Sequence, residues 1–395
     1  MSLIRTADYA DSKRATTPRM LVRSGQAIVS ILLNWGLLVC VVIAVIAIQD
    51  RDAASARAPL PPPRARLSAS DVQQWRDFPS YHGVIPVLLY HGINTSGQNY
   101  SVTPRLFAQQ MMALHVAGFH AITLRQYAEY AHGERANLPA KPILLTFDDG
   151  RLDAYREATR LLRQFGFHAA MFTFASWPTA HPGFSLNWGE LQRMQRSGIW
   201  TIQEHGGTGH EYIRYNAAGA IGGVYANREY LPASPGHRGH LESFRAFVRR
   251  VTGDIEWGNE QLKTQIPGYQ PISFAVPYAN FGQEETNDKR IPPFMLRWLD
   301  NHFSVLFGGD YLDKGRNRPY QIAGRFSSRH AYAYRMTMGQ RMQLPALYCR
   351  LYDWATRTPI WREYRCLHLG NIGAYTTAAV RRSVQLPPAR RAPSA

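Results

Sequence analysis

Cysteine is scarce in this sequence. Only three cysteines occur among 395 residues, and none lies in a Cys-x-x-Cys pair. Zinc and redox sites built on that motif are therefore excluded. Cys40 lies in a long apolar run, whereas Cys349 and Cys366 could pair in an oxidising compartment, which their spacing alone does not establish.

Acidic side chains are also few. The chain has 28 Asp and Glu against 45 Lys and Arg, a formal net charge of +17. A basic surface can attract nucleic acid, anionic lipid or an acidic substrate. However, no helix-turn-helix, zinc-finger or RNP pattern accompanies the charge, and no Gly-x-Gly-x-x-Gly follows an apolar run. We therefore expect neither a nucleic acid nor a dinucleotide as a partner.

Charge is absent from residues 27–48, a run of 22 residues that is apolar all round. About 20 such residues span the hydrocarbon core of a bilayer, and the run is longer than the apolar part of a signal peptide. We expect a single-pass signal anchor in the inner (plasma) membrane. Five basic residues against two acidic ones in segment 1–26 favour a cytoplasmic amino terminus, although basic residues also follow the span. The bulk of the chain would then be periplasmic or extracellular.

The remaining sequence divides by composition. Residues 49–80 are rich in Pro, Ala and Arg and predict a semi-rigid linker. A folded domain is expected over 81–335 and a carboxyl-terminal extension, packed on that domain, over 336–372. The tail, 373–395, has the composition of a disordered segment.

Short apolar runs alternate with amphipathic helical patterns along the predicted domain, as in parallel βα units. Segment 214–268 interrupts this order and predicts one helix, over 241–251. The predicted strands are 85–90, 120–124, 142–147, 168–174, 199–202, 272–278 and 321–326, and the main predicted helices are 104–117, 124–132, 154–165 and 186–197.

Two adjacent carboxylates, Asp148 and Asp149, follow the apolar run 143–147. Asp-Asp-Gly also occurs in ordinary tight turns, but here it stands at the carboxyl end of a predicted strand, where α/β folds build their sites. His205 and His210 follow about 55 residues later. If Asp149 and both histidines hold a divalent cation, Asp148 remains as an ionised base, which is the arrangement of a metal-assisted hydrolase. Alternating strand residues point to opposite faces, so we expect the two acids to have different roles.

The sequence Thr146-Phe-Asp-Asp-Gly150 and the later histidine pair resemble the polysaccharide deacetylases, the carbohydrate esterase family 4 with a NodB-type domain. That family usually has H-[ST]-x-x-H, whereas here the histidines are five apart and Gly206 replaces Ser or Thr. This spacing, with the early Tyr90-His91, resembles the poly-β-1,6-N-acetylglucosamine N-deacetylase branch. The resemblance covers about residues 81 to 330.

The resemblance implies an irregular (β/α) barrel of NodB-homology type, with fewer than eight strands. It also implies a bound metal, most often zinc, with nickel or cobalt as substitutes. Asp148 would be the catalytic base, and Asp149, His205 and His210 the metal ligands.

Three further roles complete the expected site. His91 is the candidate general acid, although it could simply cap its strand, and His330 and His368 are alternatives. A backbone N–H near Pro277 and Tyr278 would hold the oxyanion, and Arg325 would orient Asp148.

The implied function is removal of N-acetyl groups from an N-acetylglucosamine-containing polysaccharide, most simply an exopolysaccharide. Other components of exopolysaccharide synthesis or export are possible partners. The alternatives are a peptidoglycan or chitooligosaccharide deacetylase, and a catalytically inactive carbohydrate-binding component of an export machine.

Overall fold

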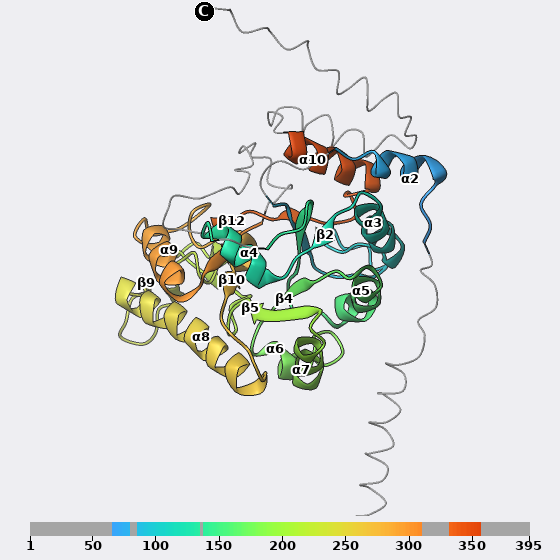
Figure 1. The fold of residues 1–395 in the computed structure, drawn as a ribbon. Coiled ribbons are helices and arrows are strands. Elements are labelled where there is room, and N and C mark those ends of the chain that lie inside the picture. Colours follow the sequence, from blue (N-terminus) through green and yellow to red (C-terminus); the bar gives the residue numbers. More distant parts are fainter. Residues whose placement is uncertain (1–64, 80–84, 135–136, 310–331, 357–395) are drawn as a thin grey trace, which may run out of the picture. The chain divides into compact units, whose positions relative to one another are not determined.

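A parallel β-sheet forms the centre of the domain (Figure 1). The computed structural model describes residues 65–79, 85–134, 137–309 and 332–356, which all lie in the unit Pro63–Ala395. Within them the sheet has nine strands, in the order β12-β11-β10-β5-β4-β3-β1-β13, with β2 paired to β3. The strands are β1 (Val87–Tyr90), β2 (His120–Ala121), β3 (Pro142–Phe147), β4 (Ala169–Thr173), β5 (Trp200–Glu204), β10 (Ser273–Ala275), β11 (Val305–Phe307), β12 (Tyr332–Ala333) and β13 (Met336–Thr337).

The sheet is rolled so that its two edges approach each other. β12 pairs with β11 at one edge and β13 with β1 at the other, yet only Tyr334 and Arg335 separate β12 from β13. Three backbone steps reach at most about 11 Å, so the two edges lie within that distance and the sheet is barrel-like. The expectation of fewer than eight strands is wrong, because β2, β12 and β13 have two residues each and leave no periodic pattern. The predicted strand 321–326 lies outside the described residues.

Helices connect the strands and cover the sheet, and their ends follow the expected capping chemistry. The Thr103 hydroxyl accepts from the Leu106 N–H at 3.1 Å, with Pro104 in the first turn. Gly166 ends its helix with a left-handed φ of 65°. The helices are α2 (Ala69–Arg76), α3 (Pro104–Val116), α4 (Leu124–Ala131), α5 (Leu152–Phe165), α6 (Trp177–Ala180), α7 (Trp188–Arg196), α8 (Phe244–Gln265), α9 (Ile291–His302) and α10 (Leu344–Thr356), with a short 3₁₀ turn, η1 (Pro277–Ala279).

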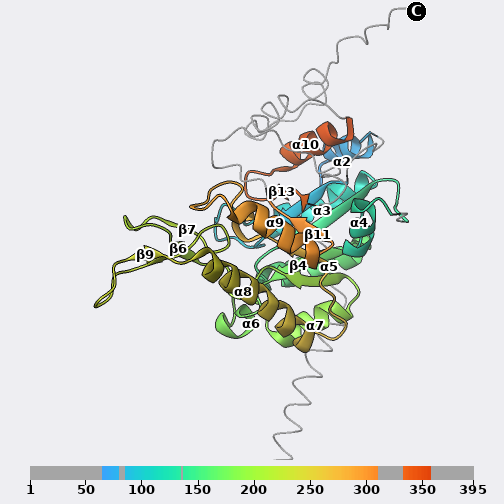
Figure 2. The ribbon, with the colours of Figure 1, turned by 90° about the vertical axis from the view of Figure 1, so that its left-hand side faces the viewer.

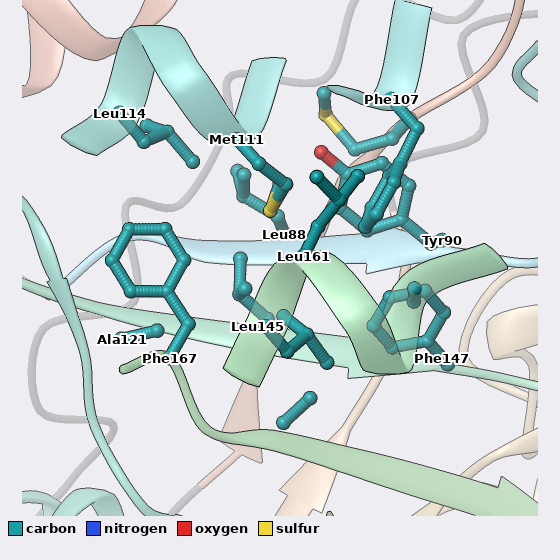
Figure 3. Packing of buried hydrophobic residues seen from close by; sticks show 14 of the residues in the cluster. Leu88, Tyr90, Phe107, Met111, Leu114, Ala121, Leu145, Phe147, Leu161 and Phe167 are labelled. Carbon is teal, nitrogen blue, oxygen red and sulfur yellow. The ribbon is translucent and has the colours of Figure 1, made fainter. Parts of the chain in front are cut away.

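Both faces of the strands are buried, which explains their continuous apolar sequences. One face contributes Val87, Leu144 and Phe172 to a single cluster that six strands share. On the other face Leu88 and Leu145 pack against α3 and α5 (Figure 3). A third cluster lies between β10, β11 and the helices α8 and α9.

The described ends of the unit pack together. Trp75 lies in the second half of the predicted linker. Its ring centroid is 5.1 Å from that of Tyr348 in α10 and 6.1 Å from that of Phe78. β13, just past the predicted domain boundary at residue 335, completes the sheet. Cys349 in α10 is disulfide-bonded.

Segment 214–268 differs from the expectation of one short helix. α8 begins after the Ser243 cap and continues to Gln265, because Ile255, Gly258 and Leu262 extend its buried stripe. Two antiparallel hairpins precede α8 and project from its amino-terminal end (Figure 2). They are β6 (Tyr212–Arg214) with β7 (Ile221–Gly223), and β8 (Tyr230–Leu231) with β9 (His240–Leu241).

Across the described ranges, no helix combines the length and apolarity that crossing a membrane requires. The predicted anchor, 27–48, lies outside those ranges.

Candidate active site

The two adjacent acids lie just beyond the end of β3. The Asp148 N–H donates to the Tyr90 carbonyl at 2.9 Å, which extends the ladder with β1 by one bond. Asp149 then takes a left-handed φ of 70° and Gly150 one of 56°. A β-carbon at Gly150 would collide with Thr173, so the turn requires glycine there. A non-glycine residue held in this conformation is a strained position of the kind found at functional sites.

This turn overrides the alternation that the sequence predicts. The His205 Nε2 lies 3.7 Å from Asp148 Oδ2 and 3.7 Å from Asp149 Oδ1, so both carboxylates face the same ring nitrogen. Strand alternation fails because β3 ends at Phe147 and the chain turns at Asp149. Any difference between the two acids must therefore come from their other partners.

Asp148 is paired with a buried arginine. Arg335, in the link between β12 and β13, donates from Nη1 and Nη2 to the two oxygens of Asp148, at 2.7 Å each. Its Nε donates to the Gly308 carbonyl at 2.8 Å, and its side chain is only 1% exposed. Burial alone would raise the pKa of Asp148, but Arg335, helped by His205 and His91, outweighs burial and holds the pKa below its usual range.

The two histidines present Nε2 toward Asp149. The His205 Nδ1–H donates to the Ala275 carbonyl at 2.6 Å, which leaves Nε2 unprotonated in the neutral ring. Burial lowers the pKa of His205 more than the nearby carboxylates raise it, so the neutral form is favoured. His210 Nε2 lies 3.9 Å from Asp149 Oδ1. The Tyr278 hydroxyl donates to the His210 carbonyl at 2.9 Å and lies 3.2 Å from its Nδ1.

Whether these residues suit a metal ion depends on their free donor atoms. Over the described part of the chain, no group of three or more His, Cys, Asp or Glu side chains is arranged so that it could hold a metal ion as it stands. Yet Asp149 Oδ1 is buried without a hydrogen-bond partner among the described residues, and it is the atom that both Nε2 atoms approach. Ligand atoms around one tetrahedral zinc are about 3.4 Å apart, so separations of 3.7 and 3.9 Å need only a small inward shift. The carboxylate oxygen and the two imidazole nitrogens are donor types that bind divalent cations.

The structure places the other predicted residues unevenly. His91 follows β1 close enough to Asp148 for its charge to lower the pKa of that acid. Its Nδ1 is buried, with no hydrogen-bond partner in the part of the chain that the structure describes. Pro277 and Tyr278 form η1 beside His210, with Tyr278 at a φ of 56°. Three predicted residues lie outside the described ranges: Arg325, His330 and His368.

Two groups at the site have no counterpart in the sequence analysis. Arg335 makes a contact with Asp148 of the kind that was expected of Arg325. The one sequence feature that could have pointed to Arg335 is that it is the single charged residue in the run Tyr332–Met338. Asp254 of α8 accepts hydrogen bonds from the loop that joins the two histidines. A lone acid in a helix gives no sequence signal of that kind.

Comparison with known proteins finds similar sequences across this region. The polysaccharide deacetylase family model matches residues 135–289. The chain is 24% identical over 233 residues to the poly-β-1,6-N-acetyl-D-glucosamine N-deacetylase of Escherichia coli K12, covering 55% of this chain and 33% of that protein. It is 33% identical over 88 residues to YxkH of Bacillus subtilis, whose name describes it as a polysaccharide deacetylase. This match covers 22% of this chain and 31% of that one. The chain thus spans about a third of the length of these curated relatives.

The fold has a match among solved structures. A de-N-acetylase from Aggregatibacter actinomycetemcomitans superimposes with a TM-score of 0.52 at 19% identity, covering 65% of this chain and 95% of that one. This likeness concerns the fold, a rolled parallel α/β sheet. The polysaccharide deacetylase family model covers the part of the same unit that holds Asp148, Asp149, His205 and His210.

Proposed function

We propose that this chain is a metal-dependent hydrolase that removes N-acetyl groups from an N-acetylglucosamine-containing exopolysaccharide. The observation that carries the proposal is the buried, unpartnered Asp149 Oδ1 facing two histidine Nε2 atoms, with an arginine-held carboxylate beside them. A cation bound by Asp149, His205 and His210 would polarise the acetyl carbonyl and make water easier to deprotonate.

The chain's own residues then divide the proton transfers. Asp148 stays ionised because the positive charge of Arg335 stabilises its carboxylate. It can therefore accept a proton from the attacking water. His91, on the neighbouring strand end, is the candidate donor to the leaving amine. Tyr278 holds His210 by its hydroxyl, and the backbone of Pro277–Tyr278 is the proposed support for the oxyanion.

A poly-β-1,6-N-acetylglucosamine substrate is the favoured choice within this class. Its support is the five-residue histidine spacing, the early Tyr90-His91, and the alignment with the Escherichia coli enzyme that is named for that polymer. Components of exopolysaccharide synthesis or export are the proposed protein partners.

Acetate release tests the activity and the linkage together. The purified chain, loaded with zinc, should release acetate from β-1,6-linked N-acetylglucosamine polymers faster than from β-1,4-linked chitooligosaccharides or peptidoglycan. A chelator should stop the release, and added zinc, cobalt or nickel should restore it. Faster release from the β-1,4-linked substrates would contradict the proposed β-1,6 specificity and favour a chitooligosaccharide or peptidoglycan deacetylase. No release from any polymer, with binding retained, would identify a non-catalytic carbohydrate-binding component instead.

The proposed location is the outer side of a plasma membrane, with segment 27–48 as the anchor. Its supports are the uncharged run of 22 residues and the disulfide at Cys349, a bond that oxidising compartments favour. A phosphatase reporter fused after residue 66 should be active only outside the cytoplasm. Activity of a cytoplasmic reporter at the same junction would show that residue 66 lies in the cytoplasm, which contradicts the proposed orientation.

A further inference from the structure

The loop between the two histidines is attached differently at its two ends. At the His205 end it continues the sheet: the His205 N–H donates to the Thr173 carbonyl at 2.9 Å, and the Gly206 carbonyl accepts from the Ala175 N–H at 3.1 Å. The His210 end has left the sheet, and the His210 N–H donates back to the Thr208 carbonyl at 2.7 Å. Besides the Tyr278 hydroxyl, which donates to the His210 carbonyl, the position of His210 therefore depends on what holds Thr208.

The Gly207 carbonyl accepts from the Ser176 N–H at 3.0 Å, and on the other side of the loop one carboxylate accepts the bonds that Gly207 and Thr208 donate. Asp254 Oδ1 accepts from the Thr208 N–H at 2.9 Å and from the Thr208 hydroxyl at 2.7 Å. Asp254 Oδ2 accepts from the Gly207 N–H at 3.1 Å and from the Tyr225 hydroxyl. Four donors thus converge on one side chain, and Asp254 belongs to α8, far from the loop in sequence.

The loop lies so close to these groups that side chains are excluded from it. A β-carbon at Gly207 would lie 2.8 Å from Asp254 Oδ1 and 2.8 Å from Trp257. A β-carbon at Gly209 would collide with the Tyr225 ring. The glycines of this loop therefore reflect close backbone approach to α8 and Tyr225, not simple flexibility.

We propose that Asp254 is a positioning residue for the metal ligands: it fixes the Gly207–Thr208 backbone and so sets where His210 stands relative to His205 and Asp149. The inference rests on the proposed metal site. In this chain Gly206 stands where the related motif has Ser or Thr, so the loop takes its anchor from α8. Outer groups that orient ligands are commonly worth a factor of about 10–100 in metal affinity.

Cobalt binding provides a readout that does not depend on turnover. The purified full chain is titrated with Co²⁺ and followed by its visible absorption, and the thermal midpoint of the metal-free protein is measured in parallel. In Asp254→Asn only one oxygen accepts hydrogen bonds, so part of the loop is released, and cobalt affinity should fall about 10- to 100-fold. The matched control is Glu256→Gln, which removes the same charge from an exposed position on α8 and should bind cobalt like the wild type.

A milder variant covers the case in which Asp254→Asn fails to fold. Thr208→Val removes one of the four donors at an exposed loop position and should weaken cobalt binding about two- to tenfold, the worth of one hydrogen bond. Wild-type protein that binds no cobalt would overturn the proposed metal site. Wild-type binding with unchanged affinity in Asp254→Asn, or in Thr208→Val where that mutant alone folds, would overturn the role of Asp254 and leave the metal site standing.

Discussion

The candidate site joins two strand ends that are built in different ways. At the end of β3, Asp148 is still in the sheet: its N–H bonds to β1 and its carboxylate is locked by Arg335, with both side chains almost fully buried. After β5, His210 stands outside the sheet, its side chain 32% exposed, and is held by Tyr278 and by a loop that is fastened to α8.

The difference separates the two parts of the proposed chemistry. The base is fixed by strong, buried, charge-assisted bonds that are hard to perturb without unfolding the domain. The second histidine lies nearer the surface: a neutral bond from Tyr278, worth about 1 kcal/mol, and the attachment of its loop to the Asp254 carboxylate hold it. Mutations at the β3 end should therefore change turnover and stability, whereas mutations at the loop should change metal affinity in small steps.

Asp148→Asn should have the largest effect on turnover. The amide cannot accept a proton from water, and loss of general base catalysis costs about 10²- to 10⁴-fold in rate. Cobalt affinity should stay within a few fold of wild type, since the unpartnered ligand oxygen belongs to Asp149.

The matched variant is Asp149→Asn, which should instead lose metal and recover partly when metal is added. Both acids lie 3.7 Å from His205 Nε2, so distance alone does not distinguish them. Equal loss of cobalt in the two variants, measured by the same titration, would contradict their separate roles.

Arg335→Gln should change both stability and the pH dependence of turnover. Removing one partner of a buried ion pair costs about 3–5 kcal/mol of unfolding free energy. In the wild type the lowered pKa of Asp148 stabilises the fold above its usual value of 3.8, and that stability is lost as the pH falls through the lower folded-state value. Without Arg335 burial dominates and raises the pKa, so the acid limb of the pH–rate profile should move to higher pH.

Urea unfolding and acetate release between pH 4 and 9 check both parts of the Arg335 prediction. Arg156→Gln, at an exposed position on α5, is the control for loss of one positive charge. An acid limb that stays in place in a folded Arg335→Gln protein would show that Asp148 is not the titrating base.

The sequence predicts the β3 half of this comparison well, because its signals are local. The apolar run before Asp148, the Thr103 cap and the stop at Gly166 depend on near neighbours, and the corresponding elements are found where the patterns place them. The turn at Asp149 is the exception. Nothing in Asp-Asp-Gly distinguishes a carboxylate that continues the strand alternation from one that a left-handed φ brings to the same side.

The other half depends on contacts between distant segments, which periodicity does not reveal. Arg335 reaches Asp148 only because the sheet rolls until β12 and β13 are two residues apart. Asp254 reaches the histidine loop only because α8 is longer than its apolar pattern up to residue 251 predicted. In both cases one polar side chain serves a partner more than 40 positions away.

Gly209→Ala tests how tightly the loop lies against Tyr225. The new β-carbon would overlap the Tyr225 ring, so the loop must move, at a cost of about 1–3 kcal/mol. Metal affinity should fall along with stability, because the same movement displaces His210. Gly253→Ala is the control: it lies in α8 with open space around its β-carbon, and it should stabilise the helix by about 1 kcal/mol. Unchanged cobalt affinity and melting temperature in Gly209→Ala would mean that the loop is looser than its contacts imply.

Tyr278→Phe should have the smallest effect. The hydroxyl stays protonated, since burial raises the pKa of Tyr278, and its loss removes the bond to the His210 carbonyl. One such bond is worth about 0.5–1.5 kcal/mol, a two- to tenfold loss of cobalt affinity. The ring should remain in place, because it packs between His210 at 4.5 Å and Tyr212 at 4.6 Å. Tyr212→Phe, which removes a hydroxyl from the adjacent ring that is 57% exposed, should leave affinity unchanged. A loss above about 100-fold in Tyr278→Phe would exceed one neutral hydrogen bond and would place the phenol itself among the groups that hold the metal or its water.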